Sequence, residues 1–116
     1  MPIDQFLNKL TTSPETIEFA DTMAVIEAHY NHQPTAFTNG SATNGAEQNQ
    51  GSCKLLAFAQ LQGFNPEQTL ACFGRFYRDD VLGNPEGSDH QNIRQFMLNG
   101  WAGVSFAGTP LTAKNS

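Results

Sequence analysis

Three helix-start signals constrain this chain most, because they divide it into short helical segments. Each signal is a small polar residue followed by residues suited to a first turn: Ser13-Pro14-Glu15, Asn65-Pro66-Glu67-Gln68 and Ser88-Asp89-His90-Gln91. A polar N-cap side chain accepts a hydrogen bond from the first turn, and proline is well tolerated at the first helical position. The last two signals have the form of a capping box. They predict that a helix begins at each of these three places.

The apolar residues that follow the first signal have the spacing of an amphipathic helix. Phe19, Met23, Ile26 and Tyr30 are separated by four, three and four residues, which predicts one helix ending at about residues 29–31. Similar patterns and the other two signals predict further helices over residues 3–11, 52–62, 65–82 and 88–99. Because only Gly63 and Phe64 separate two of these segments, we expect those two helices to form an antiparallel hairpin.

Two short segments have the residue pattern of strands. The first, Thr35-Ala36-Phe37-Thr38, favours β structure and ends at the turn dipeptide Asn39-Gly40. The second, Val104-Ser105-Phe106, alternates apolar and polar side chains and has a glycine on each side. Strands this short are stable only when they are paired and covered. We therefore expect the two segments to pair, with Phe37 and Phe106 on the same buried face. From Leu111 onward we expect the chain to fray.

Residues 41–51 contain no large apolar side chain and are rich in carboxamides. We expect an ordered internal polar loop, since Asn, Gln and Thr side chains can satisfy nearby backbone groups. The loop interrupts a single domain that spans residues 1–116 and does not link two domains. The predicted fold is α+β and dominated by helices: about five helices surround a phenylalanine-rich core, with a small sheet of short strands.

The charge balance excludes two classes of partner. Six Lys and Arg against 11 Asp and Glu give a net charge of −5, and the basic residues form no cluster. Nucleic acids and anionic membranes are bound by clustered Lys or Arg, so we expect neither as a partner. We see no secretory signal and no apolar run long enough for a membrane helix. With two cysteines that read as reduced thiols, these features predict a cytoplasmic protein.

Cys53 is the candidate for covalent chemistry. It lies in the first turn of a predicted helix, where free backbone N–H groups and the helix dipole favour a thiolate. His90 would serve as its base, and Asp89 would orient the imidazole. This arrangement predicts a small cysteine hydrolase or transferase. The residue types alone favour a structural role over a catalytic one. In that alternative, Cys53 is a small buried hydrophobic residue and His90 is a solvated side chain.

Polar side chains near the two helix starts form a second candidate site. A ligand-binding domain would hold a small polar molecule with Asn44, Gln48, Gln50, Ser52, Asn92 and Arg94. Two of these, Asn44 and Gln48, would instead donate to an oxyanion in a cysteine enzyme. The cysteines and histidines have no recognised metal-ligand spacing, so we expect no metal, and no pattern indicates a cofactor.

The chain resembles the HopJ type III effector family in motifs spread in order over nearly its whole length. These motifs are FADTM (19–23), PTAFTNG (34–40), GSCKL (51–55), AFAQLQG (57–63), TLACFG (69–74), PEGSDHQNIR (85–94) and GW (100–101). The resemblance implies a bacterial protein that a type III secretion needle delivers into a plant cell, and it implies no particular activity or cofactor. The leading interpretation is therefore a HopJ-like protein that binds a protein or a small polar ligand, and the cysteine enzyme is the alternative.

Overall fold

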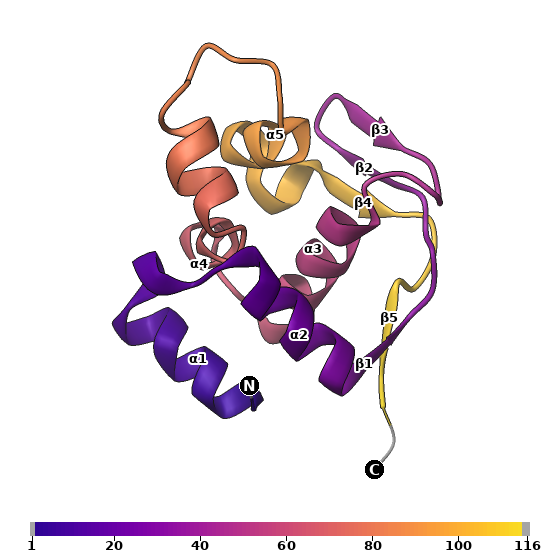
Figure 1. The fold of residues 1–116 in the computed structure, drawn as a ribbon. Helices are drawn as coiled ribbons and strands as arrows, with labels where there is room; N and C mark the ends of the chain where they lie inside the picture. Colours follow the sequence, from indigo (N-terminus) through magenta and orange to yellow (C-terminus); the bar gives the residue numbers. More distant parts are fainter. Residues whose placement is uncertain (1, 115–116) are drawn as a thin grey trace.

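Helix α3 (Gln50–Gln62) lies at the centre of the molecule, and the other helices surround it (Figure 1). The structure, a computed structural model, describes residues 2–114. Six residues of α3 are buried, which explains why its sequence lacks a clear polar face. The surrounding helices are α1 (Ile3–Thr12), α2 (Phe19–His29), α4 (Pro66–Ala71), the π-helix η2 (Phe76–Val81) and α5 (Gln91–Asn99). The predicted helix-dominated α+β class is confirmed.

The core is rich in phenylalanine, as predicted. Phe58 of α3 is fully buried, and its ring lies 5.9 Å from the ring of Phe6 and 5.8 Å from those of Tyr30 and Phe64. All three contacts have the edge-to-face geometry that aromatic pairs prefer. Leu61, at the end of α3, does not join this core and is 59% exposed.

The predicted strand pair is present. Strands β2 (Phe37–Asn39) and β4 (Val104–Phe106) are antiparallel, and Phe37 lies opposite Phe106 with ring centroids 6.0 Å apart. Phe37 is buried and Phe106 is half-buried, so both rings contact the core as expected. Strand β3 (Ala42–Asn44) adds to the other edge of β2 and completes a sheet in the order β3-β2-β4.

A second sheet was not expected from the sequence. Strand β1 (Tyr30–His32) directly follows α2 and pairs antiparallel with β5 (Leu111–Ala113). The prediction that the chain frays from Leu111 onward is therefore wrong. Leu111 is buried, and the contact between two distant segments stabilises a strand that neither segment would form alone.

The helix predicted to begin at Ser13 is interrupted. Only one 3₁₀ turn, η1 (Pro14–Thr16), follows Ser13, and Ile17 is extended and fully buried. Helix α2 begins later, with Glu18 as its N-cap and Asp21 completing a capping box. Arg78 explains the break, because its guanidinium donates to the Ile17 carbonyl at 2.7 Å and to the Glu18 carboxylate at 2.8 Å.

The helix predicted over residues 65–82 is also broken. Its capping box is confirmed, since the side chains of Asn65 and Gln68 each accept from the other's backbone N–H. However, α4 ends at Ala71, and Gly74 adopts a φ of +65° before η2 begins. A Cβ at Gly74 would lie 2.7 Å from the backbone nitrogen of Phe19. The start of α2 passes so close to Gly74 that the side chain of any other residue would collide with its backbone.

The predicted polar loop 41–51 and the predicted start of the last long helix both need correction. Strand β3 occupies residues 42–44 and α3 already begins at Gln50, which leaves residues 45–49 as the connection. Ser88 caps no helix; His90, with a φ of 52°, is the N-cap of α5. After α5, the 3₁₀ turn η3 (Gly100–Gly103) leads into β4. No helix within residues 2–114 has both the length and the apolar character to cross a membrane.

Candidate functional site

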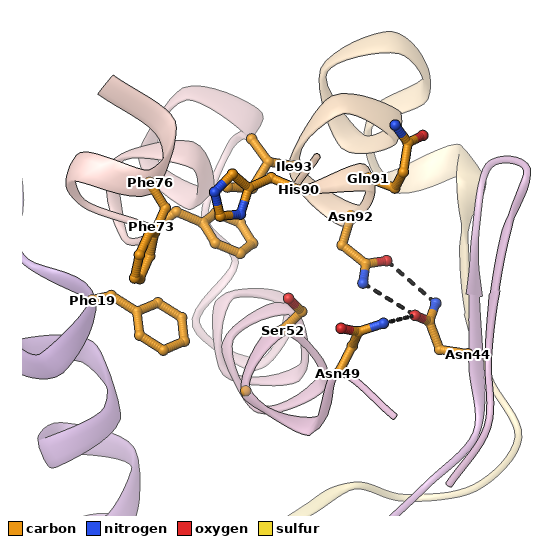
Figure 2. A pocket seen from close by; sticks show the side chains of 11 residues that line it. Phe19, Asn44, Asn49, Ser52, Phe73, Phe76, His90, Gln91, Asn92 and Ile93 are labelled. Atoms are coloured by element: carbon orange, nitrogen blue, oxygen red, sulfur yellow. Dashed lines mark hydrogen bonds between the residues drawn. The ribbon is translucent and has the colours of Figure 1, made fainter. Parts of the chain in front are cut away.

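A pocket of about 350 Å³ opens between the first turns of α3 and α5, and we call it the α3–α5 pocket (Figure 2). One wall is aromatic and is formed by Phe19, Phe73 and Phe76. The opposite wall is polar, with the side chains of Asn44, Asn49 and Asn92. Ser52 lies between the two walls in Figure 2. The pocket therefore offers an apolar surface and a hydrogen-bonding surface to the same ligand.

The polar wall is a network of asparagine carboxamides. Asn44 and Asn92 are both buried and bond to each other twice: the Nδ2 of Asn92 donates to Asn44 Oδ1 at 3.1 Å, and the Nδ2 of Asn44 donates to Asn92 Oδ1 at 3.3 Å. Asn49 Nδ2 also donates to Asn44 Oδ1, at 2.7 Å. Asn39 extends the network, because its Nδ2 donates to the Asn92 backbone carbonyl at 2.7 Å. These bonds hold β2, β3 and the start of α5 together.

Both helices begin at the pocket in the same unusual way. Their N-cap residues, Asn49 and His90, have φ values of 51° and 52° and are the non-glycine residues with positive φ in the described chain. Neither residue caps its helix with its side chain. The left-handed conformation costs an L residue energy, less for Asn and His than for most, and residues held in it by their surroundings cluster at functional sites.

The first turns of both helices bring backbone N–H groups to the α3–α5 pocket. The first backbone hydrogen bond of α3 is from Cys53 N–H to Asn49 O. The N–H groups of Gly51 and Ser52 come before this bond and therefore have no acceptor within the helix. In α5 the first such bond is from Ile93 N–H to His90 O, so the N–H groups of Gln91 and Asn92 likewise have no acceptor within the helix. All four of these residues line the α3–α5 pocket. Helix N-termini carry partial positive charge, so the pocket favours an acceptor oxygen or an anion.

His90 joins the aromatic wall and has an acidic partner. Its ring centroid lies 5.4 Å from that of Phe76, which in turn contacts Phe19 edge-to-face at 5.4 Å. Its Nε2 lies 3.0 Å from Asp80 Oδ2 and 3.8 Å from Asp89 Oδ2. The nearer carboxylate is thus Asp80, whereas Asp89 was expected to orient the imidazole. Asp89 instead accepts from Arg94, and this hydrogen bond lowers the pKa of the Asp89 carboxyl.

Cys53 lies outside the pocket and faces the core. Its side chain is fully buried, and its Sγ donates to the Thr35 carbonyl at 3.6 Å. Burial raises the pKa of the Cys53 thiol to about 11, opposite to the lowered pKa expected from the helix start. The position in the first turn was predicted correctly, but the helix turns the side chain away from the free N–H groups. The structure therefore does not bring Cys53 and His90 together at one site.

The burial of Cys53 predicts slow alkylation of the native protein. With a pKa of about 11, only about one thiol in ten thousand is ionised at pH 7. We expect iodoacetamide to label Cys53 at least tenfold more slowly in native protein than in urea. Cys72, with a pKa raised to about 12, should react more slowly still. Mass spectrometry of each site would measure both rates, and fast labelling of native Cys53 would restore the case for a reactive thiol.

Three predicted ligand-binding residues lie outside the α3–α5 pocket and stabilise nearby backbone. Gln50 Oε1 accepts from the Thr35 N–H at 3.1 Å, and Gln48 Oε1 accepts from the Gly45 N–H at 2.9 Å. Arg94 binds the carbonyls of Asp89 and Pro85. The other three, Asn44, Ser52 and Asn92, do line the pocket.

Sequence reasoning missed Asn49 and the aromatic wall. Phe19 and Phe76 were interpreted as core because they are apolar, and only the fold shows that they border a cavity. Within residues 2–114, no three His, Cys, Asp or Glu side chains come together as metal ligands would. The chemistry that these residues offer is hydrogen bonding, aromatic contact and a single imidazole.

Comparison with known proteins gives a family and a structure. The model of the HopJ type III effector protein family matches residues 3–111. A crystal structure of a protein of unknown function, VPA0580, is 58% identical and superimposes with a TM-score of 0.96, over 98% of this chain and 95% of that one. Among curated proteins, none matches the chain significantly.

Proposed function

The chain belongs to the HopJ type III effector protein family, and on this premise we propose that it acts by binding a small polar ligand in the α3–α5 pocket. The observation that carries the proposal is the convergence of two uncapped helix N-termini on one cavity. Delivery into a host cell by a type III secretion needle is part of the proposal and is supported by the family description alone.

The dimensions of the pocket support a small molecule. Pockets that hold such ligands have volumes of about 300–1,000 Å³ and combine an apolar lining with a few convergent polar groups. The α3–α5 pocket, at about 350 Å³, lies at the lower end of this range. It would accept a ligand with one flat ring and one polar group.

The lining supports a ligand with acceptor oxygens on one side and an aromatic ring on the other. The N–H groups of Gly51, Ser52, Gln91 and Asn92 would donate to a carboxylate, phosphate or carbonyl oxygen. The ring would lie against Phe76 and Phe19, where offset or edge-to-face contacts are favourable. The cysteine enzyme has less support, because the Cys53 thiol is buried and un-ionised at neutral pH.

Two matched probes test the proposal by NMR of the ¹⁵N-labelled chain. We expect benzoate or phenyl phosphate to shift the amide signals of Gly51, Ser52, Gln91 and Asn92, and the uncharged benzyl alcohol to shift them far less. Phe76→Ala removes part of the aromatic wall and should weaken binding about tenfold. Leu98→Ala, at an exposed residue outside the pocket, is the control and should leave binding unchanged. Shifts confined to other regions, or equal binding by both variants, would contradict the proposal.

A further inference from the structure

Among the residues that line the α3–α5 pocket, His90 is the one with a titratable side chain. The other lining side chains are apolar, hydroxyl or carboxamide groups, which carry no charge. Histidine is the side chain whose charge ordinarily changes between about pH 5 and pH 8. The side-chain charge on the pocket wall is therefore set by the protonation of a single imidazole.

The first turn of α5 holds this imidazole beside backbone N–H groups that line the pocket. The carbonyl of His90 accepts the N–H groups of Ile93 and Arg94, at 3.0 and 3.1 Å. His90 is thus fixed to the same turn as Gln91 and Asn92, whose N–H groups have no acceptor within the helix. In Figure 2 the ring lies over the ligand space, on the side of the aromatic wall. An anion at the start of α5 would therefore lie close to the imidazole.

Asp80 of η2 occupies one of the two ring nitrogens of His90. Its Oδ2 lies 3.0 Å from Nε2, and Nδ1 has no hydrogen-bond partner within residues 2–114. Because a carboxylate accepts from Nε2–H, the neutral ring has its lone pair on Nδ1, and a proton gained by the ring makes Nδ1 a donor. Nδ1 is the ring nitrogen left for a ligand, and protonation decides whether it can donate.

The other charged groups around the imidazole are neutralised by partners of their own. Asp89, whose Oδ2 lies 3.8 Å from the ring Nε2, accepts from Arg94. Glu18, at the start of α2, accepts from Arg78 of η2 at 2.8 Å. Helix α3 contributes no charged side chain to the pocket. The imidazole and Asp80 therefore act as a pair whose charge is −1 when the ring is neutral and zero when it is protonated.

We propose that His90 and Asp80 make the α3–α5 pocket selective for an ionised acid group and couple its binding to the uptake of one proton. This inference rests on the proposed function, because it concerns the same pocket. With a neutral ring, the pair repels a carboxylate or phosphate; with a protonated ring, the repulsion is removed and Nδ1–H donates to the anion. A carboxylate should therefore bind the protonated form about tenfold more tightly than the neutral form.

The histidine signals of the full chain test this coupling directly by NMR. The chain has three histidines, and the Cε1–H signal of each reports its protonation as the pH changes. A tenfold preference of benzoate for the protonated ring must, by linkage, raise the pH at which His90 is half-protonated by about one unit in saturating benzoate. His29 and His32 lie outside the pocket and should not change. The uncharged benzyl alcohol should move none of the three.

Variants at two histidines and one aspartate test the same coupling through the affinity for benzoate. Asparagine tolerates the left-handed conformation of residue 90 and carries no charge, so His90→Asn should bind benzoate equally at about pH 5.5 and pH 8. His29→Asn, outside the pocket, is the control and should bind about tenfold more tightly at the lower pH, as the wild type should. Asp80→Asn removes the carboxylate that favours the imidazolium, so its change in affinity should occur at lower pH than in the wild type.

The outcomes separate this inference from the proposed function. If benzoate bound the wild type equally at both pH values, or left the half-protonation of His90 unmoved, the coupling would be overturned and the proposed function would stand. If benzoate shifted no amide signal of the pocket at either pH, both would be overturned. A pH dependence that persisted in His90→Asn would belong to another group and would overturn the role of His90.

Discussion

Replacing Gly74 with alanine is expected to lower the free energy of unfolding by about 3 kcal/mol. About 1 kcal/mol of this comes from forcing an L residue into the left-handed region, where Gly74 has a φ of +65°. The remainder comes from overlap, because the new Cβ would lie 2.7 Å from Phe19 N and 2.9 Å from Glu18 Cα. Both contacts are with backbone, which cannot move without shifting α2.

Gly63→Ala is the matched control for this prediction. Gly63 also has a positive φ, +72°, but a Cβ there would meet nothing within 4 Å. The control should therefore lose only the conformational part, about 1 kcal/mol. Urea unfolding at equal protein concentration would measure both values. If the two variants lost equal stability, the close approach of residues 18–19 to Gly74 would not be a constraint on the fold.

The elements that the sequence predicts well are those fixed by local chemistry. The capping box at Asn65 and Gln68 forms as expected because all of its atoms lie within four residues. The pairing of β2 with β4 was also predictable, since each segment carries one aromatic residue between small or hydroxyl residues. In both cases the local pattern and the tertiary structure agree.

The elements that the sequence misses depend on distant contacts. Nothing near Ile17 indicates that Arg78, far along the chain, will bind its carbonyl and interrupt a helix. The pairing of β1 with β5 likewise joins residues 30–32 to residues 111–113, and neither strand has a pattern of its own. Such contacts are decided by packing, which overrides local propensity.

The candidate site was predicted in part for the same reason. Asn44, Ser52 and Asn92 were identified because they are polar and lie near helix starts, and all three line the α3–α5 pocket. Cys53 was chosen by its helical position, but the direction of its side chain depends on how α3 is rotated in the core. A one-residue difference in position turns a helical side chain by about 100°, so Ser52 lines the pocket and Cys53 faces the core.

The asparagine network should be the most sensitive part of the pocket wall. Asn92→Ala removes one donor and one acceptor from the buried Asn44 carboxamide and leaves Asn39 with only the Asn92 carbonyl. Asn49 and the Phe37 carbonyl still bond to Asn44, so the cost is that of the three hydrogen bonds lost, about 1 kcal/mol each, or about 2–3 kcal/mol in the free energy of unfolding. Asn99→Ala, on the same helix but exposed, is the control and should cost less than about 0.5 kcal/mol.

The same variant links the stability of the network to the proposed function. Because Asn44 and Asn92 join β3 to the first turn of α5, losing their bonds should loosen the N–H groups that line the α3–α5 pocket. We therefore expect Asn92→Ala to weaken benzoate binding as well as stability, and Asn99→Ala to change neither. Urea unfolding and NMR titration of both variants would measure the two effects. Full benzoate affinity in a destabilised Asn92→Ala protein would show that the network supports the fold and takes no part in positioning the ligand.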